Sequence, residues 1–394
     1  MTISRAIGDA MQKSSWIRKM FEEGLMLKRE HGEDAVHDFS LGNPEIEPPE
    51  EFLKTLEECA SDRSPGLHRY MPNAGYQWVR EKIAAAKSRE SGVKVPWENV
   101  IMTVGAGGAL NVFFKAVCDP GDEVVILAPY FVEYLFYVTN HGGVVKVCET
   151  NEDFSINLGN LEKCIGPRTK AVMLNTPNNP TGVVYREEVL HEVAALLAKK
   201  EKEYKRDIYL ISDEPYKRII FDGEKHPQFL KIYHNAVVAH SHSKDLGLPG
   251  ERIGTLVISP NCTHAHDIVG ATTFAIRVLG FVNAPGLFQR AVADHQKTAI
   301  DPLIYRKKRD LICSIFDEAG IEYVKPKGAF YIFPKSPIPD DIAFVKILLK
   351  HLVLAVPGSG FGRAGYLRFA YCVSDSHIHA AAAGIKKSVK EAKR

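Results

Sequence analysis

The feature that most constrains the fold is an alternation of short apolar runs with helix-like stretches through the middle of the chain. Residues 109–118 place their apolar side chains on one helical face, and residues 186–203 are expected to form a helix with a charged end. The short runs are mostly apolar at both odd and even positions, which is typical of strands covered by helices on both faces. They fall at residues 100–104, 123–127, 144–147, 171–174, 208–211, 237–240 and 253–258. This alternation predicts an α/β fold with an open sheet.

The pattern changes after about residue 285. Helices are expected at 302–318, at 341–350 and at the end of the chain, with strands at 321–324, 329–333 and 366–372. This mixture predicts a smaller α+β domain. Because 394 residues exceed what one hydrophobic core usually covers, two packed domains are expected. The expected division is 1–48 as an N-terminal arm and part of the small domain, 49–284 as the large domain, and 285–394 as the small C-terminal domain.

Composition narrows the class of protein. A formal net charge of +2, with 45% apolar and 25% charged residues, is ordinary for a globular protein and argues against nucleic-acid binding. No apolar run approaches the length of a membrane span or of a signal-peptide core. The seven cysteines are widely spaced and form no CxxC motif, so neither a disulfide framework nor a metal site is expected. A cytoplasmic location is the expectation that follows.

The segment that carries most chemical information contains Ser241, Ser243 and Lys244, with Arg252 eight residues further on. The lysine follows a predicted buried strand, whereas most lysines lie on the surface. A lysine that acts as a nucleophile must lose its proton, and both burial and a nearby cation lower its pKa. Arg252 could be that cation, or it could hold an anionic group of a cofactor through two hydrogen bonds.

Two further segments follow predicted strands. Asp213 ends one strand, where it could pair with a cationic ring nitrogen of a ligand or cap the N-terminus of a helix. The loop 175–182, with Asn179 near its centre, is held rigid by two prolines and ends in a glycine. It could present an amide to an oxygen anion, or it could be a simple turn.

A glycine-rich turn joins the strand at 100–104 to the helix at 109–118. Gly105, Ala106 and Gly107 could bring backbone N–H groups close to a phosphate. The turn matches neither the GxGxxG fingerprint nor the P-loop, so it supports no nucleotide-binding motif.

Taken together, the order and spacing of these segments, with Arg368 in a late Leu-Arg-Phe, resemble the class I/II pyridoxal-phosphate-dependent aminotransferases of fold type I, aspartate aminotransferase-like. The resemblance covers the chain from about Asp38 to the C-terminus. It implies a large domain with a mixed, mostly parallel sheet covered by helices, a smaller α+β domain, and pyridoxal 5′-phosphate as cofactor.

The resemblance also implies roles for the residues that match the family's motifs. Lys244 would form the Schiff base with the cofactor and move a proton between the substrate Cα and the cofactor C4′. Asp213 would keep the pyridine nitrogen protonated, and Tyr216 and Asn179 would hydrogen-bond the phenolic oxygen. Phe131 would stack on the cofactor ring. The phosphate would be held by Gly105, Ala106, Gly107, Ser241, Ser243 and Arg252, with Tyr70 reaching it from a neighbouring subunit of a homodimer.

For the substrate, Arg368 matches the arginine that grips the α-carboxylate, assisted by Asn179 and the backbone near Gly42. Some aspartate-specific relatives place a lysine, which holds the distal carboxylate, where this chain has Gly107. Arg277 or Arg18 could supply that charge instead. Residues 16–21 resemble the segment that closes over the substrate.

The expected reaction is a ping-pong transfer of an amino group from an L-amino acid to a 2-oxo acid, with aspartate and 2-oxoglutarate as the leading pair. Three alternatives stay open. The enzyme could use aromatic amino acids, alanine or other neutral donors; it could be a carbon–sulfur lyase of the same fold; or the chain could be a non-catalytic cofactor-binding regulator.

Overall fold

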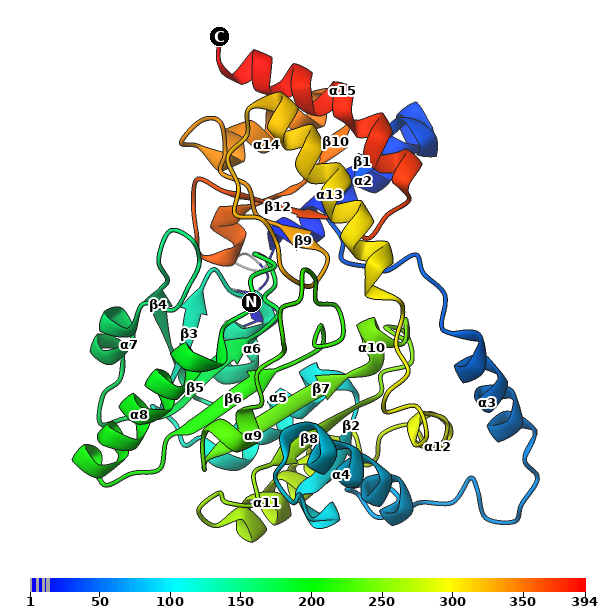
Figure 1. Ribbon diagram of the computed structural model, residues 1–394, viewed down its shortest axis with the longest axis vertical. Coiled ribbons are helices and arrows are strands. Elements are labelled where there is room, and N and C mark those ends of the chain that lie inside the picture. Colours follow the sequence, from blue (N-terminus) through cyan, green and yellow to red (C-terminus); the bar gives the residue numbers. More distant parts are fainter. Residues whose placement is uncertain (1, 5–6, 9–10, 12–14) are drawn as a thin grey trace.

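The structure is a computed structural model that describes residues 2–4, 7–8, 11 and 15–394 (Figure 1). Its largest element is a seven-stranded sheet in the order β2-β8-β7-β6-β5-β3-β4. All strands of this sheet run in the same direction except β8, which is antiparallel to both of its neighbours. The strands are β2 (Val100–Thr103), β3 (Glu123–Ala128), β4 (Val144–Glu149), β5 (Thr169–Asn175), β6 (Tyr209–Asp213), β7 (Ala236–Ser241) and β8 (Gly254–Ile258).

Apolar side chains from both faces of this sheet are buried, as the sequence predicts, except in the edge strand β4, where Val144 and Val147 are exposed. In β7, Val237 and Ala239 pack into one hydrophobic cluster with the helices α5 (Gly105–Val117) and α11 (Ala265–Val278). Val238 belongs to a second cluster on the other face, to which the helix α8 (Glu187–Tyr204) contributes. The alternation puts successive strand residues on opposite faces, so both faces need a helical cover. The predicted α/β fold is therefore confirmed.

The remaining chain forms a smaller α+β part above the sheet in Figure 1. The helices α2 (Ser15–His31), α13 (Pro302–Ala319), α14 (Asp341–Lys350) and α15 (Asp375–Ala392) surround two small sheets. One sheet pairs β1 (His37–Asp38) with β10 (Val353–Leu354), which ties the N-terminal segment to the C-terminal one. The other contains β9 (Tyr331–Ile332), β11 (Val356–Pro357) and β12 (Leu367–Ala370). The domain boundaries near residues 49 and 285 remain a prediction.

The shorter connecting elements complete the chain. The helix α4 (Gln77–Ser91) packs beside β2 and ends at Gly92 in the left-handed conformation. The others are α3 (Glu50–Ser61), α6 (Glu133–Thr139), α7 (Leu158–Cys164), α9 (Phe229–Ile232), α10 (His242–Asp245), α12 (Gly286–Val292) and the 3₁₀ turns η1 (Glu33–Ala35), η2 (Trp97–Asn99) and η3 (Gly358–Phe361). Within the part of the chain that the structure describes, no helix is long and apolar enough to cross a membrane.

Two local predictions are wrong. The helix after β2 begins at Gly105 and not at residue 109, because the glycine-rich segment itself forms the first turn of α5. Residues 321–324 form no strand. Ile321 is buried, and its amide donates to the carbonyl oxygen of Phe316 in α13. The Glu322 carbonyl oxygen accepts from the amide of Lys335, and these two bonds form no strand ladder. The apolar run reflects burial against the core and not ladder pairing.

Candidate active site

A cavity of about 350 Å³ opens where the parallel strands of the large sheet end. Ligands in open α/β sheets bind at this edge, outside the carboxyl ends of the strands. The smaller part closes the cavity from above with Gly42, Tyr331 and Arg368. Leu41, beside Gly42, also lines the cavity. The remaining lining residues come from the large part: Ala106, Gly107, Leu110, Phe131, Glu133, Tyr134, Tyr137, Asn175, Asn179, Asp213, Pro215, Tyr216, Ser241, Ser243, Lys244 and Arg252.

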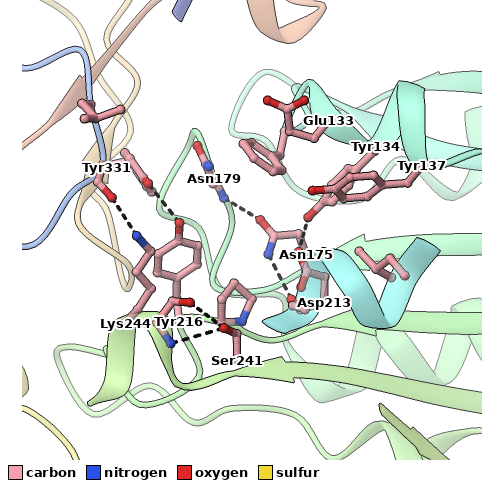
Figure 2. Close-up of a pocket in the computed structure, with 18 of the residues that line it drawn as sticks. Glu133, Tyr134, Tyr137, Asn175, Asn179, Asp213, Tyr216, Ser241, Lys244 and Tyr331 are labelled. Carbon is pink, nitrogen blue, oxygen red and sulfur yellow. Dashed lines mark hydrogen bonds between the residues drawn. The ribbon is translucent and has the colours of Figure 1, made fainter. Parts of the chain in front are cut away.

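Lys244 projects into this cavity from the short helix α10, directly after β7. Its Nζ donates a hydrogen bond to the carbonyl oxygen of Gly42 at 2.7 Å (Figure 2). Burial lowers the pKa of its amine to about 8, and the positive charges of Arg252 and Arg368 add to the lowering. The expected reduction of the pKa is therefore present, with burial as its largest cause. At neutral pH an appreciable fraction of this amine is uncharged and nucleophilic.

Acetylation of Lys244 by a trace of acetic anhydride is expected to accelerate with pH and to level off above about pH 8, because its lowered pKa is about 8. The neutral amine is the nucleophile, so protonation at lower pH protects it. An ordinary lysine, with a pKa of about 10.4, gains reactivity well beyond that pH. Competitive labelling with peptide mass spectrometry gives the profile of each lysine. A Lys244 profile that coincides with that of an ordinary lysine would contradict the lowered pKa.

Asp213 ends β6 and points into the cavity between Tyr134 and Asn175 (Figure 2). Its Oδ2 accepts a hydrogen bond from the hydroxyl of Tyr134 at 2.5 Å, whereas its Oδ1 is buried and has no partner in the described chain. Burial raises the pKa of the carboxyl to about 7. No helix begins after Asp213, so the alternative of a helix cap is wrong. A cationic hydrogen-bond donor in the cavity would satisfy Oδ1 and lower this pKa again.

An anion site lies at the start of α5. Arg252 places its Nη1 3.5 Å from Ser243 Oγ, and the Ser243 and Ser241 hydroxyls are 2.6 Å apart. Gly105 has a φ of +75°, and a Cβ at this position would lie 2.7 Å from Arg252 Nη2, so a side chain here would displace the guanidinium. The guanidinium, the two hydroxyls and the free N–H groups of the first helical turn suit a phosphate.

Arg368 stands at the opposite end of the cavity on β12. Its Nη1 donates to Asn179 Oδ1 at 3.2 Å and its Nη2 to the carbonyl oxygen of Ser40 at 2.5 Å, while its buried Nε has no partner among the described residues. The rings of Tyr331 and Phe361 lie against the guanidinium at 4.9 and 4.7 Å from their centroids. A buried arginine with an unused donor is suited to bind a carboxylate.

The loop 175–182 is fixed by hydrogen bonds of Asn175, so it is more than a simple turn. Asn175 accepts from the amide of Asn179 at 2.7 Å and donates from Nδ2 to the carbonyl oxygen of Asp213 at 3.0 Å. These bonds set Asn179 and Asp213 at fixed positions on adjacent strand ends. Nearby, the hydroxyls of Tyr216 and Tyr331 are 2.9 Å apart, and burial raises the pKa of both phenols, so both stay protonated.

Most of the site residues predicted from sequence meet in this cavity, but three do not. Gly105 is behind the lining, where it makes room for Arg252. Tyr70 is 89% exposed and does not line the cavity of its own chain. Arg277 is also exposed, on α11, away from the lining. The side chain of Arg18 lies outside what the structure describes, although its backbone belongs to α2.

Five polar lining residues were missed by the sequence analysis: Glu133, Tyr134, Tyr137, Asn175 and Tyr331. The first three lie on α6, and the spacing of Glu133 and Tyr137 puts them one helical turn apart on the same face. The four-residue spacing of Glu133 and Tyr137, directly after Phe131, was the sequence signal that could have predicted their place in the cavity. Tyr331 reaches the cavity through packing between the two parts of the chain, for which the sequence offers no local pattern.

The cavity combines a reactive amine, a buried carboxylate and an anion site at one edge of the sheet. Together with the fold, these groups indicate a class of enzymes. Residues 35–385 match the family described as Aminotransferase class I and II, and the chain belongs to this family. The fold is fold type I, and the enzyme is an aminotransferase. The family uses pyridoxal phosphate and acts on amino acids and 2-oxo acids, so the prediction of an aminotransferase is confirmed.

Individual relatives agree. The aspartate/prephenate aminotransferase of Thermus thermophilus is 33% identical over 369 residues, which cover 91% of this chain and 92% of the relative. An amino transferase from Eubacterium rectale superimposes with a TM-score of 0.96 at 36% identity, over 100% of both chains. The aspartate aminotransferase of Thermus thermophilus with maleate superimposes with a TM-score of 0.87 at 30% identity, over 98% of this chain and 100% of that one.

Proposed function

We propose that this enzyme moves the amino group of an L-amino acid to a 2-oxo acid by a ping-pong mechanism, with pyridoxal 5′-phosphate attached at Lys244. Aspartate and 2-oxoglutarate form the leading pair, because relatives of this chain are named as aspartate aminotransferases. The observation that carries the proposal is that the buried Lys244 amine, the unpartnered Asp213 Oδ1 and the anion site share one cavity.

The residues present fit this cofactor. Asp213 Oδ1 is a buried acceptor without a donor. A protonated pyridine nitrogen is a donor that needs such an acceptor. Arg252, Ser241, Ser243 and the N–H groups at the start of α5 would hold the phosphate, and Phe131 would face the ring. When bound, the cofactor supplies an electron sink for the charge that develops at the substrate Cα.

The chain's own residues would orient the substrate and move its proton. Arg368 would bind the α-carboxylate through its free Nε and its nitrogen shared with Asn179. This places the substrate Cα toward Lys244, whose lowered pKa of about 8 allows Nζ to take up and release a proton near neutral pH. The protonated hydroxyl of Tyr216, bonded to that of Tyr331, would donate a hydrogen bond toward an oxygen anion.

A homodimer is part of the proposal. Tyr70 is exposed, and its segment is joined to the end of α11 by the side chain of Asn283, whose Nδ2 donates to the carbonyl oxygen of Pro72 at 3.0 Å. On and after α11, Phe274, Val278 and Phe281 are 62%, 51% and 39% exposed. These exposed apolar side chains precede Asn283, which contacts the segment of Tyr70, and large exposed apolar side chains favour a face that a second copy covers.

The substitution Phe274→Asp is expected to convert the dimer into monomers, because a carboxylate buried in an apolar interface costs several kcal/mol. Sedimentation equilibrium measures the mass, with 43.8 kDa expected for the monomer and twice that value for the unaltered protein. Leu303→Asp is the matched control, because Leu303 is 48% exposed but lies on α13. A monomeric unaltered protein, or equal effects of the two substitutions, would contradict the proposed face.

Neutral donors are the second candidate substrates, and one observation favours them. Lys244, Arg252 and Arg368 are the cations among the described lining residues, and each has one of the roles given above. None is left for a distal carboxylate.

A carbon–sulfur lyase, the third alternative, would use the same Lys244 and Asp213 but would release ammonia and pyruvate. A cytoplasmic location is also proposed, supported by the seven free thiols.

The test is an absorbance titration of the purified protein, reconstituted with the cofactor, against aspartate, glutamate, alanine, phenylalanine and methionine without an acceptor. Loss of the yellow band and formation of the pyridoxamine form support the proposal and rank the donors. A yellow protein that responds to none of them would refute transamination of these donors. Steady release of ammonia and pyruvate from a sulfur-containing donor would identify a lyase instead.

A further inference from the structure

The helix α6 carries an acidic residue that the proposed reaction leaves without a role. Glu133 and Tyr137 line the cavity one helical turn apart, on the wall opposite Lys244 and Tyr216 (Figure 2). Glu133 is half-buried, and its carboxylate makes no hydrogen bond or ion pair with any residue that the structure describes. An acid that lines a substrate cavity without a partner is available to the substrate.

Among the described residues, no ion pair compensates the charge of Glu133. Burial raises the pKa of its carboxyl, and no positive group counteracts this effect. Burial also raises the pKa of the Tyr137 phenol well above its usual value, and the charge of Glu133 is the next largest cause, so the two groups lie within electrostatic reach. Tyr137 therefore stays protonated beside a carboxylate, and its hydroxyl can serve as a donor or an acceptor to a ligand.

Tyr137 also explains the glycine at position 107. A Cβ at Gly107 would lie 2.8 Å from the Tyr137 hydroxyl oxygen, which is too close for any side chain unless the tyrosine moves. The wall formed by α6 thus occupies the space that a side chain at position 107 would need. A side chain at position 107 would have to displace the Tyr137 hydroxyl, and the Glu133 carboxylate lies on the same wall.

We propose that Glu133 sets the charge preference for the substrate side chain, favouring side chains that donate hydrogen bonds or carry a positive charge over those with a carboxylate. The inference rests on the proposed function, because it assigns the α6 wall to the side chain of the amino-group donor, and within that function it favours the neutral donors over the aspartate pair. Two carboxylates in a partly desolvated cavity repel each other more strongly than in water. An amide or an ammonium group can instead donate a hydrogen bond to Glu133.

The test compares aspartate with asparagine, which have the same shape and differ in charge. Glu133→Gln is expected to raise the ratio of kcat/KM for aspartate over asparagine about tenfold, in line with the loss of about 1.4 kcal/mol of repulsion. Glu152→Gln is the matched control, because it removes the same charge from an exposed residue outside the cavity. A change of less than threefold in a folded Glu133→Gln variant, or a fall in the ratio, overturns the proposal.

A binding measurement separates this inference from the proposed function. Isothermal titration of the reconstituted protein with maleate, a dicarboxylate, and with propionate, a monocarboxylate, requires no amino transfer. Maleate is expected to bind about tenfold more tightly to Glu133→Gln than to the unaltered protein, with propionate little changed. If these two amino acids and the donors of the absorbance titration all fail to react, the proposed function fails, and maleate still decides the role of Glu133. Equal maleate affinities would overturn that role.

Discussion

Replacing Lys244 by arginine is expected to lower the rate of amino transfer by about 10,000-fold or more, the upper range for loss of an acid–base group. Arginine keeps the positive charge and the approximate length of the side chain, so it can still donate to the carbonyl oxygen of Gly42. It cannot lose its proton at neutral pH, and so it supplies neither a nucleophile nor a base. The measurement is the single-turnover rate with aspartate or, if aspartate does not react, with the best donor.

Lys217→Arg is the control for this substitution. Burial lowers the pKa of Lys217 as well, but its amine pairs with Glu90 at 3.0 Å and does not line the cavity. Arginine can keep that ion pair, so the rate is expected to stay within about threefold of the unaltered enzyme. Comparable losses in the two variants would mean that the effect comes from stability and that Lys244 has no special role.

The substitution Asp213→Asn is expected to lower the rate about 1,000-fold, the scale seen when a buried electrostatic group is lost from an active site. The amide keeps the size of the side chain and can accept the hydrogen bond from Tyr134, but it carries no charge. Without this charge the buried Asp213 position no longer stabilises a protonated ring nitrogen, and the electron sink weakens. Asp213→Glu, which keeps the charge, is expected to retain more activity than Asp213→Asn.

The control is Glu214→Gln at the next position. Glu214 is buried, accepts a hydrogen bond from Ser212 at 3.0 Å and does not line the cavity. Its substitution removes a neighbouring negative charge and is expected to affect stability more than the chemical step. Circular dichroism at rising temperature measures the stability of each variant. If Glu214→Gln and Asp213→Asn lower the rate equally, the assigned role of Asp213 is wrong.

The sequence predicted those parts of the fold that local patterns control. The helix 341–350 coincides with α14, because Asp340 caps it and its apolar residues keep helical spacing. The strands of the large sheet were found because their sequences are apolar at both odd and even positions, although the edge strand β4 leaves Val144 and Val147 exposed. The prediction of a strand at 321–324 was wrong for the same reason. An apolar run indicates that a segment is buried, but it does not indicate whether a partner strand lies beside it.

The site was predictable where a residue follows a strand end. Lys244, Asp213 and Asn179 lie in such positions, and the parallel sheet brings their side chains to one edge. Glu133 and Tyr331 were missed, because their place in the cavity depends on how α6 and the smaller part pack against the sheet. Tyr70 and Arg277 are exposed and do not line the cavity of their own chain, so their predicted roles depend on a second copy.

The central claim is that Lys244 carries the cofactor, and reduction with borohydride tests it most directly. The purified protein is reconstituted with pyridoxal phosphate, reduced, digested and analysed by peptide mass spectrometry. The account predicts that the stable pyridoxyl-phosphate adduct lies on Lys244 and is absent from Lys217 and from the Lys244→Arg variant. An adduct on a different lysine, or an unmodified Lys244 in a yellow protein, would contradict the account.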